Sequence, residues 1–218
     1  MNEQHVVVVF PHPDDESFGA SGTISKFREE GVPVTYLCGT LGEMGRNMGN
    51  PPFANRETLS SYRIQELKEA VTKLDISLEL LGYRDKTIEF EPIDELAEDL
   101  LKRLERLKPS IVITHYPGFA VHPDHDALGA AVVAAVEKMK KEERPEIWMH
   151  AISNDHEERL GKPEIIHDVT PYWDKKLAAI KSHLSQADGM MNLIEKHDQA
   201  SEQVNRLKTE RFYRYPTK

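Results

Sequence analysis

The sequence lacks several features that would assign it to common classes of protein. Its 218 residues include a single cysteine, Cys38, so no disulfide can form within the chain, which fits a reducing compartment. No apolar run approaches the roughly 20 residues that span a bilayer. The start, MNEQHVVVVFP, has neither the cationic segment nor the apolar length of a signal peptide. We therefore expect a soluble, cytoplasmic protein.

Concentrated positive charge is also missing. Asp and Glu number 37 against 28 Lys and Arg, which gives a net charge of −9, and Lys and Arg form no dense block. The chain thus lacks the electrostatic footprint of a nucleic-acid binder and the basic patch of a membrane-surface protein. We expect neither nucleic acid nor membrane as a partner. The sequence leaves the oligomeric state open, a homo-oligomer included.

What the chain does have is an alternation of strand and helix patterns. Apolar runs predict the strands, of which residues 6–10 and 110–115 are expected to be buried, and apolar residues at helical spacing predict the helices between them. The expected strands are 6–10, 33–39, 77–81, 110–115 and 146–152, and the expected helices are 17–30, 58–74, 92–107, 122–142 and 171–185. This order predicts an α/β fold, a single three-layer domain with helices on both faces of a Rossmann-like, mainly parallel sheet.

Two segments fall outside this alternation. Residues 41–57 are rich in Gly, Asn and Pro and are expected to form a long loop. From about residue 186 to 218 the chain is polar, and we expect a helical appendage to a domain that spans residues 1–218.

Polar clusters follow the predicted strands at the edge where α/β sheets bind ligands. These clusters are PHPDDE (11–16) after the first strand, TLGE (40–43) after the second, GYRD (82–85) after the third and HPDH (122–125) after the fourth. If the sheet is parallel, all four meet in one crevice.

The first and last of these clusters predict a metal site. His12 and Asp15 are three positions apart, as are His122 and His125, and this spacing places two side chains on one helical face. Two histidines and one carboxylate, with a position left open, are typical of a catalytic metal centre. A divalent cation would also offset the repulsion among three consecutive carboxylates. Taken singly, the acidic residues are also typical helix caps. The spacing does not decide which HPDH histidine is the ligand.

PHPDDE after the first strand and HPDH after the fourth resemble the motifs of the LmbE-like zinc deacetylases, the PIG-L family. The similarity runs from residue 5 to about 186 and includes YRIQEL, GYRD and SHLSQ. It implies a metal-dependent hydrolase that uses one Zn²⁺ per chain to remove the N-acetyl group from a small GlcNAc conjugate. The spacing and the loop NMGNPPFANRE are most similar to bacillithiol-biosynthesis deacetylases of the second type, which act on N-acetylglucosaminyl-malate.

Carried onto this sequence, the resemblance implies the roles of the motif residues. His12, Asp15 and His125 match the zinc ligands, and Asp14 matches the general base. Glu16, the last residue of PHPDDE, receives no role beyond a supporting one.

The same resemblance implies residues that act on the substrate. His122 matches the histidine that polarises the amide and protonates the leaving amine, and Asp124 matches the carboxylate that orients it. Arg63 and Asp85 match substrate-binding residues, the first for the anionic or aglycone part and the second for sugar hydroxyls.

One position departs from the family pattern. Some relatives have a tyrosine two residues before HPDH that donates to the oxyanion, whereas this chain has Ala120. Tyr116, Tyr213 and Tyr215 are the candidates to replace it. The role of His183, in SHLSQ, is left open.

Other functions fit parts of the pattern. A deacetylase or amidase acting on another GlcNAc conjugate, such as a thiol S-conjugate, would carry the same motifs. A non-haem Fe(II) oxygenase also uses two histidines and a carboxylate, so the sequence leaves the choice between Zn²⁺ and Fe²⁺ open. We associate such oxygenases with β-barrel scaffolds, however. A receiver-like signalling module has an acidic pair after its first strand, but it would be shorter and would need Asp85 as phospho-acceptor.

Overall fold

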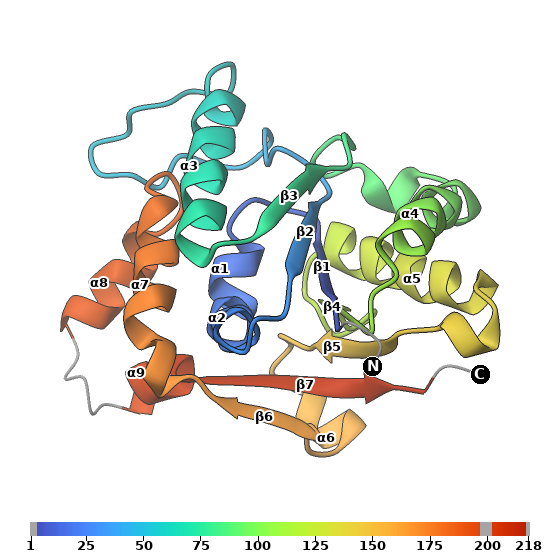
Figure 1. Cartoon of the computed structure of the whole chain (residues 1–218). Helices are drawn as coiled ribbons and strands as arrows, with labels where there is room; N and C mark the ends of the chain where they lie inside the picture. Colours follow the sequence, from blue (N-terminus) through green and yellow to red (C-terminus); the bar gives the residue numbers. More distant parts are fainter. Residues whose placement is uncertain (1–3, 197–201, 217–218) are drawn as a thin grey trace.

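A seven-stranded sheet forms the centre of the computed structural model, which describes residues 4–196 and 202–216 (Figure 1). The strand order is β3-β2-β1-β4-β5-β7-β6. The strands are β1 Val6–Phe10, β2 Val34–Cys38, β3 Ser77–Leu80, β4 Ile111–His115, β5 Glu146–His150, β6 Ile165–Asp168 and β7 Thr209–Tyr215. Strands β1 to β5 are parallel, which confirms the predicted mainly parallel α/β sheet.

Helices cover both faces of this sheet. They are α1 Asp15–Gly19, α2 Ser21–Glu29, α3 Leu59–Leu74, α4 Ile93–Leu107, α5 Pro123–Lys138, α6 His156–Leu160, α7 Trp173–Ser182, α8 Asp188–Lys196 and α9 Glu202–Leu207. Helices α4 and α5 lie on one side of the sheet and α2, α3 and α7 on the other (Figure 1). Within the described ranges, no helix is both long and apolar enough to cross a membrane.

Strand β1 lies between two hydrophobic cores, one on each face of the sheet, and is fully buried, as its continuous apolar run predicts. Because successive side chains of a strand point to opposite faces, Val7 and Val9 join the core beneath α4 and α5. Val6, Val8 and Phe10 join the core beneath α2, α3 and α7. The two layers of helices therefore fix β1 from both sides, and with it the position where PHPDDE begins.

Three expected helices have clearly different ends in the structure, among them the helix expected at 171–185, which spans Trp173–Ser182. The helix expected at 17–30 starts at Asp15 and is broken at Ala20 into α1 and α2. At this break the hydroxyl of Ser21 donates to the carbonyl of Ser17 at 2.6 Å, a side-chain bond that competes with the helical backbone pattern. The helix expected at 122–142 ends at Lys138, and a short 3₁₀ turn, Lys141–Glu143, follows it.

The prediction of a wholly helical C-terminal appendage is wrong. Residues 188–196 and 202–207 are helical, but β7 is an antiparallel strand inserted between β5 and β6. Its sequence TERFYRY hides this role because one inward position is a charge, Glu210. Lys176 of α7 neutralises that charge with an ion pair of 2.6 Å. Strand β6 was not predicted either.

We expect Lys176→Met to lower the free energy of unfolding by about 3–5 kcal/mol, since it would leave the Glu210 carboxylate buried without its cation. Both side chains of this pair are 2% exposed. Lys138→Met is the matched control, because Lys138 pairs with the exposed Asp94. Its loss should cost no more than about 1 kcal/mol. Denaturant unfolding measures both, and equal losses would contradict the structural role given to Lys176.

Candidate active site

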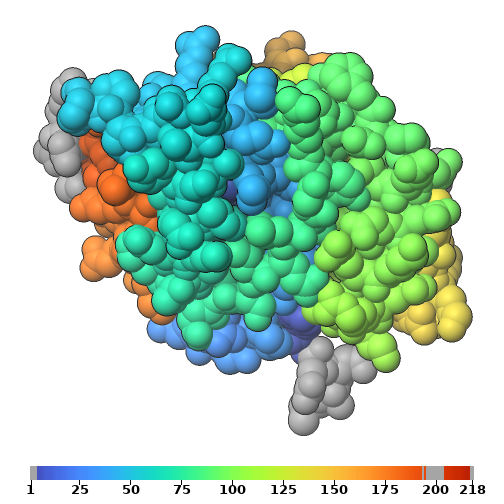
Figure 2. Space-filling view, turned by 90° about the horizontal axis from the view of Figure 1, so that it is seen from above, coloured from blue at the N-terminus to red at the C-terminus, as the bar shows by residue number. Residues whose placement is uncertain are grey.

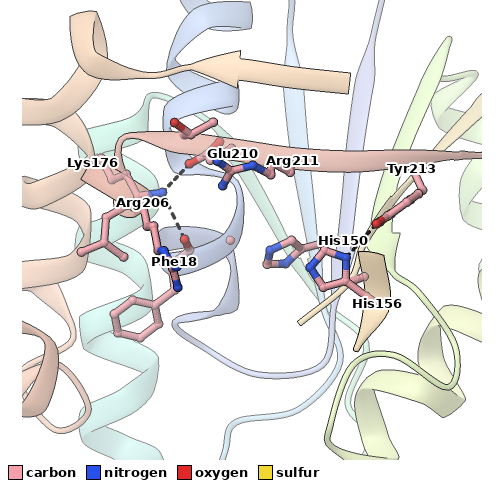
Figure 3. Close-up of a pocket in the computed structure, with 12 residues that line it drawn as sticks. Phe18, His150, His156, Lys176, Arg206, Glu210, Arg211 and Tyr213 are labelled. Carbon is pink, nitrogen blue, oxygen red and sulfur yellow. Dashed lines mark hydrogen bonds and ion pairs between the residues drawn. The ribbon is translucent and has the colours of Figure 1, made fainter. Parts of the chain in front are cut away.

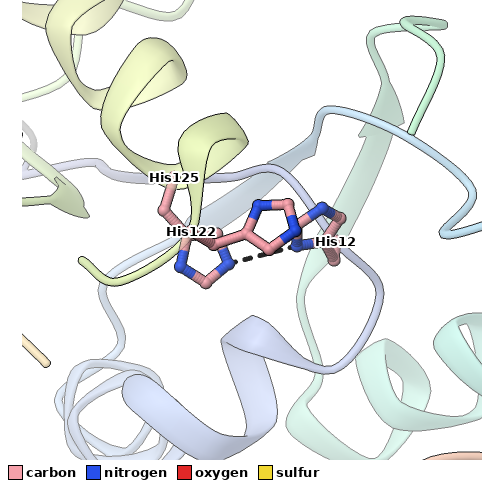
Figure 4. Close-up of side chains that lie close together, drawn as sticks. All are labelled: His12, His122 and His125. Carbon is pink, nitrogen blue, oxygen red and sulfur yellow. Dashed lines mark hydrogen bonds between the residues drawn. The ribbon is translucent and has the colours of Figure 1, made fainter. Parts of the chain in front are cut away.

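Side chains from the loops after β1 and β4 meet at the carboxyl edge of the sheet. His12 comes from the first loop, and His122 and His125 come from the start of α5. Figure 4 shows the three imidazole rings gathered together, and their ligand atoms lie within 4.8 Å of one another. Figure 2 looks down on this edge and shows the blue-to-cyan loop between β2 and α3 next to the green segment that follows β3.

Donor atoms of three residues in this cluster have the spacing of metal ligands. Nδ1 of His12 lies 3.1 Å from Nε2 of His125 and 3.4 Å from a carboxylate oxygen of Asp15. The other oxygen of Asp15 lies 3.3 Å from Nε2 of His125. Ligands held at about 2.0–2.1 Å around tetrahedral zinc are about 3.3 Å apart. The donor set therefore fits a zinc ion or a similar divalent cation.

The rings of His12 and His125 each donate to an acceptor on the side away from the proposed metal, and this fixes the orientation that metal binding needs. Nε2 of His12 lies 3.2 Å from Asp85 and 3.3 Å from Asp124, so this nitrogen donates and Nδ1 keeps its lone pair. Nδ1 of His125 donates to the carbonyl of Ala120 at 3.0 Å, which leaves the lone pair on Nε2. Histidines that bind metals are oriented in this way by carboxylates or carbonyls.

His122 is held in the opposite tautomer to His125 and in the same tautomer as His12. Its Nδ1 accepts the backbone N–H of Asp124 at 3.2 Å, so the neutral ring carries its proton on Nε2. Burial lowers the pKa of His122, which favours this neutral form. The sequence spacing left His122 and His125 equivalent. Their hydrogen bonds distinguish them, because His122 presents an N–H group whereas His125 presents a lone pair that can bind a metal.

The carboxylate of Asp124, which the resemblance predicts to orient His122, makes its hydrogen bonds to other groups, although its charge opposes the lowering of the His122 pKa by burial. One of its oxygens accepts the backbone N–H of Lys86 at 2.7 Å and approaches His12, and the other accepts that of Ile88 at 3.1 Å. Asp124 reaches His122 through its backbone amide instead.

Asp14 has an unusual backbone conformation, with φ of 111° in the left-handed region that side chains other than glycine rarely adopt. Its carbonyl accepts the first two backbone bonds of α1, and its carboxylate accepts a hydrogen bond of 3.0 Å from Arg63. Burial raises the pKa of Asp14 to about 6, although the charge of Arg63 opposes this rise. A carboxylate with a pKa in this range suits a general base near neutral pH.

Arg63 is predicted to bind substrate, but the structure gives it a different setting. Its side chain is 4% exposed and donates to Asp14 and to the carbonyls of Pro13 and Gly42. A Cβ atom on Gly42 would come within 2.0 Å of the guanidinium, so the arginine fills the space that the glycine leaves. Arg63 thus ties the loop after β1 to the loop after β2, and little of it is left for a substrate.

Asp85 is also predicted to bind substrate and is also buried, with 3% of its side chain exposed. One oxygen faces His12, and the other accepts the backbone N–H of Met44 at 2.8 Å. The carboxylate of Glu43 in turn accepts the backbone N–H of Asp85 at 3.0 Å. The four polar clusters of the sequence therefore meet in one place, but Asp85 supports a histidine there rather than facing open space.

The structure places three residues beside this site to which the motifs assign no specific chemistry. Glu16 and His183 are fully buried, and Nε2 of His183 lies 2.8 Å from the Glu16 carboxylate. His115 ends β4 and stacks on His125 with ring centroids 3.9 Å apart. The sequence marks each of them only by position: Glu16 is the last residue of PHPDDE, His183 lies in SHLSQ, and His115 ends an apolar strand.

The tyrosines proposed to replace the missing oxyanion donor lie in one aromatic group. Tyr116 packs edge-on against Tyr213 and Tyr215. The hydroxyl of Tyr213 donates to the carbonyl of Gly161 at 2.8 Å and lies 2.7 Å from Nδ1 of His156. These contacts direct Tyr213 away from the metal-ligand cluster.

A cavity of about 200 Å³ lies beside this centre, under β7 (Figure 3). His150 lines it and stacks on His115 at 5.8 Å, which links the cavity to the ring of His125. Lys176 pairs with Glu210 and His156 with Tyr213, as the dashed lines of Figure 3 show. The buried Nδ1 of His150, by contrast, has no hydrogen-bond partner among the described residues. The cavity is a neighbour of the metal-ligand cluster, which is not among its lining residues.

Comparisons with known proteins agree with this geometry. Residues 7–136 match the PIG-L family, described as GlcNAc-PI de-N-acetylase. The probable N-acetyl-alpha-D-glucosaminyl L-malate deacetylase 2 of Bacillus anthracis is 48% identical over 100% of this chain and 97% of its own length. The protein of the same name from Bacillus subtilis (strain 168) is 47% identical over 93% of this chain and 92% of its own length.

Solved structures share the fold. The N,N'-diacetylchitobiose deacetylase of Pyrococcus horikoshii superposes with a TM-score of 0.75 and 25% identity over 99% of this chain and 85% of its own. GalB, the 4-carboxy-2-hydroxymuconate hydratase of Pseudomonas putida KT2440, superposes with a TM-score of 0.76 at 20% identity over 98% and 97% of the two chains, which shows likeness of fold alone. From its family match and its relatives, the chain belongs to the PIG-L family, as the motifs PHPDDE and HPDH predict.

Proposed function

We propose that this chain is a metal-dependent amidohydrolase that removes the N-acetyl group from N-acetylglucosaminyl-malate, a step of bacillithiol biosynthesis. The observation that carries the reaction class is the convergence of His12, Asp15 and His125 beside the buried carboxylate of Asp14. The substrate is supported by relatives named for that activity, which are 47–48% identical over nearly the whole chain.

The ligands of the proposed Zn²⁺ are His12, Asp15 and His125. The ion would polarise the amide carbonyl and lower the pKa of water to about 7. His122 is the poorer ligand because its accepting nitrogen is already occupied by the backbone N–H of Asp124. The choice of Zn²⁺ over Fe²⁺ rests on the resemblance to zinc deacetylases.

Two residues of the chain move protons in this proposal. Asp14 accepts a proton from the water that attacks the acetyl carbonyl, and its position beside Arg63 fixes the carboxylate for this step. His122 presents Nε2–H to the substrate. As the imidazolium, reached when Nδ1 takes up a proton in place of its hydrogen bond from Asp124, it gives the Nε2 proton to the nitrogen of the departing sugar amine and returns to the neutral imidazole. The products are acetate and a free amine. Asp124 supports the site indirectly. Its carboxylate holds His12, and its backbone N–H holds His122.

The alternatives are weaker. A different GlcNAc conjugate, such as a thiol S-conjugate, stays the main alternative substrate, because Arg63 and Asp85 are too buried to define an aglycone site. The α/β sheet does not favour an oxygenase. The burial of Asp85 against His12 does not favour phosphorylation in a signalling module. The cytoplasmic location, the oligomeric state and a single domain over residues 1–218 stay predictions.

An assay for free amine tests the proposed reaction. We expect the purified, zinc-loaded chain to release amine from N-acetylglucosaminyl-malate with a kcat/KM at least about 10-fold higher than from an N-acetylglucosaminyl thiol S-conjugate or from GlcNAc itself, since binding of a remote substrate group raises kcat/KM. Removal of the metal with a chelator should abolish turnover, and added Zn²⁺ should restore it. Equal rates on all three compounds would refute the malate assignment, and no amine release would refute the reaction.

A comparison of two histidines tests the ligand assignment. His125→Ala should weaken Zn²⁺ binding by more than about 100-fold because it removes a ligand, which exceeds the 10- to 100-fold effect of losing a supporting residue. His122→Gln should bind Zn²⁺ within about 10-fold of the native chain and lower kcat by about 10²–10⁴-fold, as expected for loss of a proton donor. Competition with a chromophoric chelator measures the affinities. The reverse pattern would mean that His122 is the ligand.

Asp14→Asn separates the base from the metal site. The amide has nearly the size of the carboxylate but cannot accept the proton, so kcat should fall by about 10²–10⁴-fold while one Zn²⁺ per chain is retained. Metal content and steady-state kinetics are measured on the same preparation. Loss of the metal, or a kcat near that of the native chain, would show that Asp14 is not the base.

A further inference from the structure

The backbone of Asp14 depends on a second buried carboxylate. Its N–H donates to Oε2 of Glu16 at 3.0 Å, while φ of Asp14 is held at 111°. A non-glycine residue in such a conformation costs free energy and persists only where its surroundings enforce it. Arg63 acts on the carboxylate of Asp14, and Glu16 acts on its backbone.

Glu16 is in turn held by a residue from the far end of the chain. Its side chain is fully buried, and Oε1 accepts hydrogen bonds from Ser17 Oγ at 2.5 Å and from Nε2 of His183 at 2.8 Å. His183 directly follows α7 and is also fully buried. A buried carboxylate is tolerated only when such donors satisfy it, so the loss of His183 would leave Glu16 with neutral donors alone.

The residues after His183 fasten neighbouring parts of the site. The backbone N–H and the hydroxyl of Ser185 donate to Glu66 at 2.7 and 2.6 Å. Glu66 lies three positions after Arg63 on α3, and therefore on the same side of that helix. The carbonyl of Ser185 also accepts the N–H of Met48 from the loop after β2, at 2.7 Å. SHLSQ thus joins the turn that contains Asp14, the helix that carries Arg63 and the 41–57 loop.

We propose that His183 is a positioning residue of the deacetylase reaction. Through Glu16 it holds the Asp14 backbone in the conformation that presents the carboxylate to Arg63. The proposal rests on the proposed role of Asp14 as the base. A distortion of about 1 Å at a reacting group can cost up to about 100-fold in rate, so the effect belongs in kcat.

Two substitutions of His183 test this role. His183→Leu removes the donor to Glu16 and should lower kcat by about 10- to 100-fold, with KM within about threefold of the native value and one Zn²⁺ per chain retained. His183→Gln keeps a side-chain N–H that can donate to Glu16, and its kcat should stay within about threefold. Each variant is assayed for thermal midpoint, metal content, kcat and KM.

Lys176→Met is the matched control. It breaks another buried ion pair of α7, one that does not contact Asp14. Assayed below its midpoint, this variant should lose stability and keep its kcat. An equal fall of kcat in Lys176→Met and His183→Leu would show a general effect of destabilisation and overturn the proposal.

Further outcomes are decisive. A His183→Leu variant with kcat within about threefold of the native chain would overturn the proposal, as would one that loses zinc but turns over normally per bound ion. If His183→Leu does not fold, Glu16→Met gives the same test, since it removes the acceptor of both the Asp14 N–H and His183; native kcat in that variant would likewise overturn the proposal. Asp14→Asn distinguishes failure of the His183 proposal from failure of the proposed base. If Asp14→Asn is inactive while His183→Leu is active, only the role of His183 is refuted. If Asp14→Asn is active, the role of Asp14 as the base is refuted as well.

Discussion

The buried negative charge at the end of β1 is the constraint on which the rest of the site depends. Three consecutive carboxylates lie in a place where charge is costly unless it is paired. Each has a separate partner: Arg63 for Asp14, the two proposed ligand histidines for Asp15, and His183 for Glu16. These partners come from α3, from the loop after β1, from the first turn of α5 and from the residue after α7. The site therefore forms only when distant parts of the chain have packed onto the sheet.

The sequence predicted those features that depend on local pattern. Continuous apolar runs identified β1 and β4, and helical spacing identified α4, because a central parallel strand and an amphipathic helix leave clear signals. Strand β7 left no such signal. It is antiparallel, it carries the charge of Glu210 inward, and its partner Lys176 lies on another helix. A strand whose burial depends on an ion pair across the structure cannot be read from its own hydrophobicity.

At the site, too, local pattern could be predicted from the sequence, whereas contacts between distant parts of the chain could not. The residues of the motifs lie together in the structure, and their burial limits what each of them can contact. Arg63 and Asp85 matched substrate-binding positions in sequence, whereas both are closed in by Asp14, His12 and the loop after β2. The roles of Arg63 and Asp85 in substrate binding stay predictions. Burial of this kind depends on Gly42 and on the path of the 41–57 loop, which no local pattern specifies.

The likeness to GalB shows why the fold does not determine the reaction. A chain of similar shape is a hydratase, so the chemistry must come from details placed on a shared scaffold. In this chain the decisive detail is the position of ring protons. His12 and His125 have their lone pairs directed toward Asp15 and each other, whereas His122 has its lone pair occupied by a backbone amide. Two histidines three residues apart on one helix thus have different chemistry, because one caps the helix and the other donates to the loop before it.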